Sequence, residues 1–234
     1  MNFENKTVLV TGAAGNLGQA VAAAFAAQGA RLVLLGRSVA SLQAALGEAG
    51  EQRLYVAADL LDGPQVAAAL AAAVQRFGRI DVLCNLAGGF RMGDAVHETT
   101  DSTWDFLMDI NARTLLNMAK SVVPHLLAHG GGKIVNVGAF AAQRGAAKMG
   151  AYCAAKSSVI RLTEAMAAEL REKNINVNCV LPTVIDTPEN RAAMPDADPS
   201  RWVAPADLAN VVVFLASDAA RAVHGAALPV TGLS

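Results

Sequence analysis

The sequence predicts a single α/β domain built on a doubly wound, parallel sheet of about seven strands. Short apolar runs rich in β-branched residues alternate with segments of helical spacing, which is the pattern of a parallel sheet covered by helices. Turn residues follow the first four apolar runs, at Gly12, Gly36, Asp59 and Asn85. Parallel sheets bind ligands at these carboxyl ends. No linker or repeat interrupts the 234 residues, so we expect one domain.

The composition argues against nucleic-acid binding, membrane insertion and secretion. A net charge of −1 provides no general attraction to nucleic acid or to anionic membranes. No apolar run reaches the roughly 18–20 residues that span a bilayer, and residues 1–6 do not resemble a signal peptide. The three cysteines, Cys84, Cys153 and Cys179, form no CxxC pair. We expect them to be reduced and buried in a cytoplasmic protein.

The first strand, residues 7–10, leads into a glycine loop and then a helix that ends near Gly29. Gly12 allows a tight turn, and Gly18 lets the helix approach the strand closely. Backbone N–H groups at the start of such a helix can receive a pyrophosphate. The candidate residues for this Rossmann-type site are Gly12, Gly15, Asn16, Leu17 and Gly18.

The second strand, residues 31–35, is followed by Gly36 and Arg37. A dinucleotide fold reads the adenosine ribose at this position, and an acidic side chain there binds the 2′-hydroxyl of NAD. A guanidinium is suited instead to a 2′-phosphate. Arg37 therefore favours NADP(H) over NAD(H), with a solvated loop arginine as the alternative.

The remaining elements continue the alternation of strands and helices. Two loops, residues 90–100 and 138–149, and a longer irregular stretch, residues 182–204, lie between them, and long loops in compact domains are usually functional. The predicted strands are residues 54–58, 81–84, 133–137, 176–181 and 226–230. The predicted helices are residues 63–77, about 102–127, about 152–172 and 205–215.

Two histidines, His125 and His129, are four residues apart near a helix end. Such a pair can bind a metal, but no third ligand is within reach in the sequence. We therefore predict a polar helix end and no metal site.

Tyr152 and Lys156 stand at the head of a long predicted helix. Residues four apart share a helix face, so the phenol and the ammonium project the same way. A nearby cation favours the phenolate and lowers the phenol pKa from its usual value of roughly 10. A tyrosine tuned in this way can exchange a proton near neutral pH.

Taken together, these pieces resemble the short-chain dehydrogenase/reductase family along nearly the whole chain. The resemblance implies hydride transfer with a nicotinamide cofactor. It implies Tyr152 as the acid/base, Lys156 on the nicotinamide ribose and Asn111 holding a water in the proton relay. It also implies cofactor contacts from Asp59 and Leu60, from Asn85, Ala87 and Gly88, and from Pro182, Ile185 and Thr187.

Three positions depart from the family pattern. Asn16 replaces a loop glycine, and asparagine tolerates a left-handed conformation better than most residues. Thr183 replaces the glycine of a usual Pro-Gly pair. Ala139 replaces the catalytic serine, thirteen positions before the tyrosine. A hydrogen-bond donor aimed at the negative charge that develops in the transition state can contribute ~2.7–4 kcal/mol to its stabilisation in acyl-transfer enzymes.

One branch of the family, the dihydropteridine reductases, lacks that serine, and the chain resembles it further. The resemblance lies in the segment Ala87 to Phe90 and in residues 181–191, 194–198 and 200–202. A quinonoid dihydropterin accepts hydride into a conjugated imine, so Tyr152 alone could supply the proton. The animal members have an acidic residue after the second strand and prefer NADH, which Gly36-Arg37 does not match.

The sequence therefore predicts an NAD(P)H-dependent oxidoreductase that acts on a small conjugated imine or carbonyl substrate and resembles the dihydropteridine reductases. The alternatives are a generic carbonyl or imine reductase and a catalytically weak NADP-binding sensor. Excess apolar positions along the helices of Asn111 and Tyr152 predict a homodimer or homotetramer, because related proteins commonly pair these helices between subunits.

Overall fold

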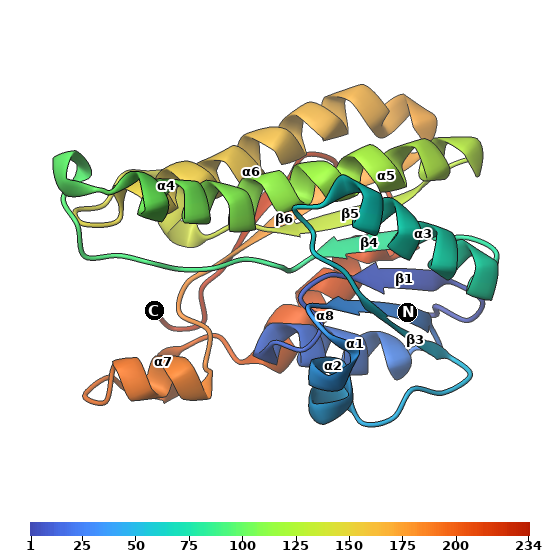
Figure 1. Cartoon of the computed structure of the whole chain (residues 1–234), viewed down its shortest axis with the longest axis horizontal. Helices are drawn as coiled ribbons and strands as arrows, with labels where there is room; N and C mark the ends of the chain where they lie inside the picture. The colour runs from blue at the N-terminus through green and yellow to red at the C-terminus, as the bar shows by residue number, and fades with distance from the viewer.

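The computed structural model describes all 234 residues, and its seven strands form one parallel sheet (Figure 1). The strand order is β3-β2-β1-β4-β5-β6-β7, so the winding reverses between β1 and β4. Ligands of such sheets bind outside the carboxyl ends of the strands, at this reversal. The strands are β1 (Thr7–Val10), β2 (Arg31–Gly36), β3 (Arg53–Ala57), β4 (Val82–Asn85), β5 (Gly132–Val137), β6 (Ile175–Pro182) and β7 (Ala227–Val230).

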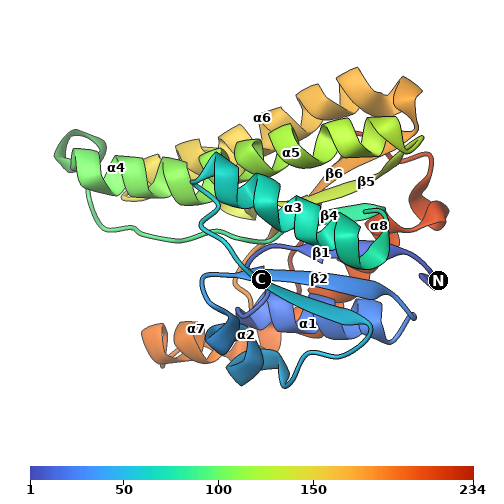
Figure 2. The same cartoon turned by 45° about the vertical axis from the view of Figure 1, so that its right-hand side comes forward.

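Helices cover both faces of the sheet, as Figures 1 and 2 show. One face carries α1 (Asn16–Ala26) and α8 (Pro205–Ala216), and the other carries α3 (Gly63–Phe77), α5 (Thr114–Ala128) and α6 (Gly150–Leu170). Successive strand residues alternate between the two apolar clusters, because side chains of a strand point to opposite faces. In β1, Val8 and Val10 pack with α1, while Leu9 packs with the other helices. The doubly wound fold predicted from the sequence is confirmed.

Two helices were not predicted. The first is α2 (Val39–Leu46), where the Ser38 hydroxyl accepts a hydrogen bond from Ser41 N at 3.1 Å. The second is α7 (Pro188–Ala193), inside the segment expected to be irregular, where Thr187 accepts from Asn190 N at 3.2 Å. Both use an N-cap hydroxyl, which satisfies one of the N–H groups that a helix start leaves unpaired.

The helix predicted from about residue 102 is continuous but irregular. It consists of α4 (Asp101–Met108), a π-helical segment (Asp109–Arg113) and α5. Single π-turns inside α-helices often occur at functional sites. Here the π-turn contains Asn111.

Several further expectations concern side chains away from the strand ends. The three cysteines are buried and form no disulfide. His125 uses Nε2 to accept a hydrogen bond from Ile80 N at 3.0 Å, and His129 stacks on it with ring centroids 4.0 Å apart. These contacts give the histidine pair a structural role. No helix combines the length and the apolar character that crossing a bilayer requires.

Candidate active site

The loops that follow β1 and β4 are joined by one hydroxyl. Thr11 Oγ1 accepts hydrogen bonds from Leu86 N at 3.0 Å and from Ala87 N at 3.1 Å. Thr11 N in turn donates to Cys84 O at 3.0 Å. This residue fixes the two loops on either side of the winding reversal. In the sequence, Thr11 is recognisable only as the start of the glycine loop.

The glycine loop after β1 matches its predicted geometry. Gly12 has φ +65°, and a Cβ there would lie 3.0 Å from the backbone of Ala87. A Cβ on Gly18 would lie 2.7 Å from Ala13 Cα and 2.8 Å from Ala13 C. Both positions therefore require glycine, the first for its left-handed turn and the second for the close approach of α1 to the loop.

Three backbone N–H groups at the start of α1 have no partner in the protein, those of Asn16, Leu17 and Gly18. Gly15 is the N-cap, in an extended conformation and without a side-chain cap. An uncapped helix start of this kind fits an anionic group such as a dinucleotide pyrophosphate. Asn16 is the first helical residue and does not adopt a positive φ, so the left-handed role considered for it is wrong.

The segment after β6 reaches back to this loop. Asn16 Nδ2 donates to Glu189 Oε2 at 2.8 Å, and Glu189 lies in the first turn of α7. Ile185 O accepts from Asn190 Nδ2 at 2.8 Å, while Thr187 caps the same helix. The residues Pro182, Ile185 and Thr187 thus lie on one continuous segment that begins at the carboxyl end of β6.

The residues predicted to read the adenosine end lie at the ends of β2 and β3. Arg37 follows β2, is exposed, and forms no ion pair or side-chain hydrogen bond, so its guanidinium is free to contact a ligand. Asp59 Oδ1 accepts from Leu61 N at 2.9 Å, which orders the turn after β3. Leu60 O accepts from Asn117 Nδ2 at 2.9 Å, tying this turn to α5.

A buried polar chain runs from β4 through β5 to α6. Asn85 Nδ2 donates to Asn136 Oδ1, and Asn136 Nδ2 donates to Thr163 Oγ1, both at 2.8 Å. Asn85 Oδ1 is buried and lacks any hydrogen-bond partner. Buried acceptors are rarely left unpaired because the loss of hydration is costly. This atom therefore fits a hydroxyl donor from a ligand, such as a ribose.

Gly88 brings two predicted catalytic residues together. A Cβ at Gly88 would lie 2.9 Å from Asn111 Oδ1 and 3.1 Å from Lys156 Nζ. Asn111 Nδ2 donates to Gly89 O at 3.0 Å and to Leu107 O at 2.9 Å, and its Oδ1 accepts from Gly89 N at 3.1 Å. The Asn111 side chain thus fixes the loop after β4. Its contact with a relay water stays a prediction.

Lys156 is buried beside this loop. Its Nζ donates to Val137 O at 2.9 Å, and burial lowers the pKa of Lys156 to about 8. A buried ammonium without a carboxylate partner is poorly solvated. Its remaining donor sites are therefore suited to oxygen acceptors of a ligand, as predicted for the nicotinamide ribose.

Tyr152 lies on the same helix, one turn before Lys156, and its ring meets Phe90 edge-on, with centroids 4.8 Å apart at 89°. Burial raises the pKa of Tyr152 to about 12, and the neighbouring Cys153 adds to the rise. The predicted lowering of this pKa by Lys156 is therefore wrong for this structure, because burial removes hydration that the charged phenolate needs. The phenol therefore carries its proton at neutral pH.

The position of the usual catalytic serine is apolar. Ala139 is buried in a cluster with Leu115, Val159 and Leu181, and Tyr152 packs against that cluster. The methyl group of Ala139 cannot donate a hydrogen bond. Tyr152 is therefore left without the second hydroxyl that the family pattern places beside it.

Three observations fit a nicotinamide dinucleotide at this edge of the sheet. They are the uncapped start of α1, the unpaired Oδ1 of Asn85, and the close approach of Asn111 and Lys156 to Gly88. The sequence had indicated each of these positions. Their shared location follows from the strand order, because β1, β4 and β5 are adjacent. The hydrogen-bonded chain through Asn136 was not predicted. The available signal was an asparagine inside an apolar strand, because a buried polar side chain needs a hydrogen-bond partner.

Comparison with known proteins agrees with this geometry. A family model described as "short chain dehydrogenase" matches residues 6–198. The chain is 35% identical to a D-threitol dehydrogenase of Mycolicibacterium smegmatis over 98% of this chain and 93% of that protein. A short-chain type dehydrogenase/reductase from Mycobacterium ulcerans superimposes with a TM-score of 0.92 at 29% identity, covering 100% and 90% of the two chains. A 3-ketoacyl-(acyl-carrier-protein) reductase from Brucella melitensis, complexed with NADH, superimposes at 0.88 with 32% identity over 98% of each.

Proposed function

The chain belongs to the short-chain dehydrogenase/reductase family, and from that premise we propose that it is an NADP(H)-preferring reductase with Tyr152 as the general acid. Its acceptor is a conjugated imine or carbonyl group, as in a quinonoid dihydropterin. The observation that carries the proposal is the partly buried Tyr152 ring, which packs against the apolar cluster that contains Ala139 in place of a serine hydroxyl. An acceptor whose charge spreads over several atoms needs only one proton donor.

Each residue has a distinct task in this reaction. A bound nicotinamide supplies the hydride. Lys156 and Asn85 hold ribose hydroxyls, and the N–H groups of Asn16 and Leu17 hold the pyrophosphate. Tyr152 donates its proton to the atom next to the reduced carbon. Phe90 covers the Tyr152 ring edge-on and keeps the phenol in place.

The direct test is the loss of absorbance of the reduced nicotinamide with NADPH and with NADH. The acceptor panel contains a quinonoid dihydropterin, cyclic imines, ketones and quinones. Reduction of the pterin or imine faster than of simple ketones is expected. Cofactor binding without turnover on any acceptor would favour a sensor. The relatives compared above carry the names of a threitol dehydrogenase and a ketoacyl reductase, so faster ketone reduction would favour the generic carbonyl reductase.

The absent serine leads to a prediction of its own. Ala139→Ser is expected to raise ketone reduction roughly tenfold or more, because a hydroxyl beside Tyr152 can stabilise an alkoxide. Reduction of a quinonoid dihydropterin should change by less than about threefold, since no single oxygen becomes charged. Steady-state kcat/KM for both substrates measures the contrast. A large gain on both would contradict the proposed charge delocalisation.

The cofactor preference depends on Arg37. Arg37→Ala is expected to weaken NADPH binding by roughly 10–100-fold, the range of a lost hydrogen bond to a charged group. NADH binding should change by less than about threefold. Fluorescence titration of both cofactors gives the two dissociation constants, with Arg171→Ala at the far end of α6 as control. Equal losses for both cofactors would refute the phosphate contact.

We also propose that the protein assembles as a homodimer or homotetramer. Trp104 on α4 and Leu116 and Leu127 on α5 are large apolar side chains that remain exposed, with Trp104 45% accessible. Exposed apolar side chains along adjoining helices are typical of subunit interfaces. Sedimentation velocity checks the proposal, and a species of 24.1 kDa at micromolar concentration would contradict it.

A further inference from the structure

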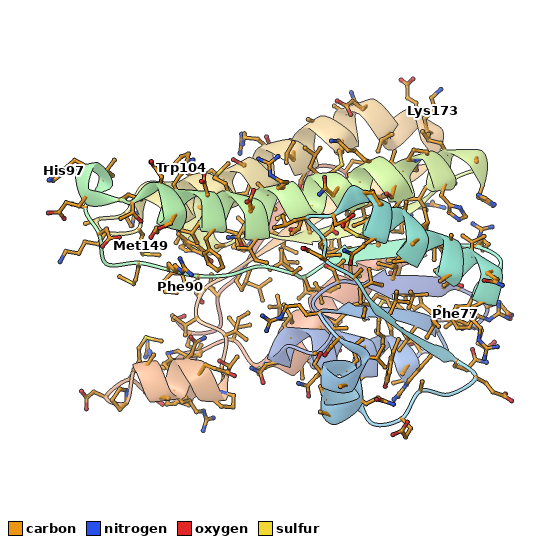
Figure 3. The ribbon with its side chains drawn as sticks, viewed as in Figure 1. Phe77, Phe90, His97, Trp104, Met149 and Lys173 are labelled. Atoms are coloured by element: carbon orange, nitrogen blue, oxygen red, sulfur yellow. The ribbon has the colours of Figure 1, made fainter.

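A cavity of about 290 Å³ opens beside the catalytic tyrosine, between the loop after β4, α4 and the start of α6. Tyr152 forms one of its walls. Apolar side chains, among them Leu107 and Met149, line another part of it. In Figure 3, Met149 and Phe90 lie at the same end of the molecule, under α4 and away from Lys173. A molecule in this cavity would contact Tyr152 at one end.

The charged residues of the cavity are unbalanced. Arg91 and Lys148 line it together with one carboxylate, Asp94, so their formal charge sums to +1. Neither cation forms an ion pair or a side-chain hydrogen bond. By contrast, Arg113 and Arg191 each hold a carboxylate oxygen at 2.6 Å. Both cations of the cavity are therefore unpaired, and its charged side chains together carry one positive charge in excess.

The side chain of Arg91 and the backbone of Lys148 are held by their surroundings. The guanidinium of Arg91 lies over the ring of Phe106, 3.8 Å from its centroid, which restricts a side chain that would otherwise be mobile. Lys148 has φ +60°, which is uncommon for a residue with a Cβ, and its carbonyl accepts from Gly93 N at 2.9 Å. That hydrogen bond joins the loop of Arg91 to the loop of Lys148. Uncommon backbone conformations of this kind cluster at ligand sites.

We propose that Arg91 and Lys148 bind a carboxylate of the substrate, so that the conjugated imine or carbonyl group reduced at Tyr152 belongs to an organic acid with an apolar body. The inference rests on the proposed reductase activity, because the reacting group of this acid lies at Tyr152. The apolar part packs on Leu107 and Met149. A single carboxylate balances the charge of +1, whereas a phosphate dianion leaves an excess negative charge. A planar carboxylate also matches the geometry of a guanidinium.

Calorimetry tests the subsite without requiring turnover. The protein saturated with NADP⁺ is titrated with 4-oxocyclohexanecarboxylate, 4-oxopentanoate and 6-oxoheptanoate, and with their methyl esters. At least one acid is expected to bind roughly tenfold or more tightly than its ester. The double variant Arg91→Gln, Lys148→Gln should reduce this acid-to-ester preference by roughly 10–100-fold. The preference should also weaken in high salt, because exposed charges are screened.

Lys173→Gln, at the far end of α6, removes an exposed cation as a control and should leave the preference unchanged (Figure 3). Circular dichroism and the melting temperature confirm that the variants fold. Equal binding of acids and esters, or a preference that survives the double variant, would overturn the inference. Tighter binding of cyclohexyl phosphate than of cyclohexanecarboxylate would overturn the assignment to a carboxylate. If an acid binds but no acceptor is turned over, the result counts against the reductase activity alone. If neutral acceptors are turned over and acids are not preferred, the result counts against the carboxylate subsite alone.

Discussion

Tyr152→Phe is expected to lower kcat by roughly 10²–10⁴-fold, the usual contribution of a positioned general acid. The substitution removes only the phenolic hydroxyl. The remaining ring keeps its edge-on contact with Phe90 and its packing against the cluster around Ala139. Cofactor affinity should therefore change little. Initial rates of nicotinamide oxidation measure the loss, and fluorescence titration measures the cofactor dissociation constant.

The chain contains one other tyrosine, which provides a matched control. Tyr55 lies on β3, and its hydroxyl donates to Gly47 O at 3.0 Å, away from the cavity beside Tyr152. Tyr55→Phe should cost about 1 kcal/mol of stability, the value of one hydrogen bond, and leave kcat unchanged. If Tyr152→Phe retained more than about a tenth of the wild-type kcat, the acid role would have to be given to another group.

The strands were predictable because each is a short apolar run between turn residues. The two helices that were not predicted are short and bury few side chains, so they were harder to identify. In α2 only Leu42 is fully buried, and α7 buries no residue. Helical periodicity is visible in a sequence only where one face is apolar. In α2 that face is limited to Val39, Leu42 and Leu46, and α7 has none. Their N-cap residues, Ser38 and Thr187, were the available signals.

The candidate site shows the same division between local and long-range information. The shared face of Tyr152 and Lys156 follows from helix geometry alone, so their proximity was predictable. The direction of the tyrosine pKa was not, because it depends on how deeply the tertiary structure buries the phenol. The bond between Asn16 and Glu189 joins segments 173 residues apart. Contacts of this kind depend on the path of a loop, which no periodicity records.

Gly18→Ala is expected to have the second large effect, on stability and on cofactor binding together. The new Cβ would lie 2.7 Å from Ala13 Cα and would also meet Gly12 O, so that backbone atoms have to move. Overpacking of this kind costs roughly 1–3 kcal/mol, and each kcal/mol lowers the melting temperature of a chain this size by about 2–4 °C. A shift of α1 also moves the unpaired N–H groups of Asn16 and Leu17, so dinucleotide affinity should fall with stability. Thermal unfolding with and without NADPH measures both effects.

Gly50→Ala is the matched control, because Gly50 lies in the turn before β3, its φ is not positive, and an added Cβ would meet no atom within 4 Å beyond its chain neighbours. At a position without strain, alanine is expected to stabilise the protein by about 0.4–1 kcal/mol, since it restricts the unfolded chain. The two substitutions add the same methyl group, so the difference in melting temperature isolates the contact between α1 and the loop after β1. If Gly18→Ala matched the control in stability and in the shift produced by NADPH, the close approach at Gly18 would not be what positions the N–H groups for the cofactor.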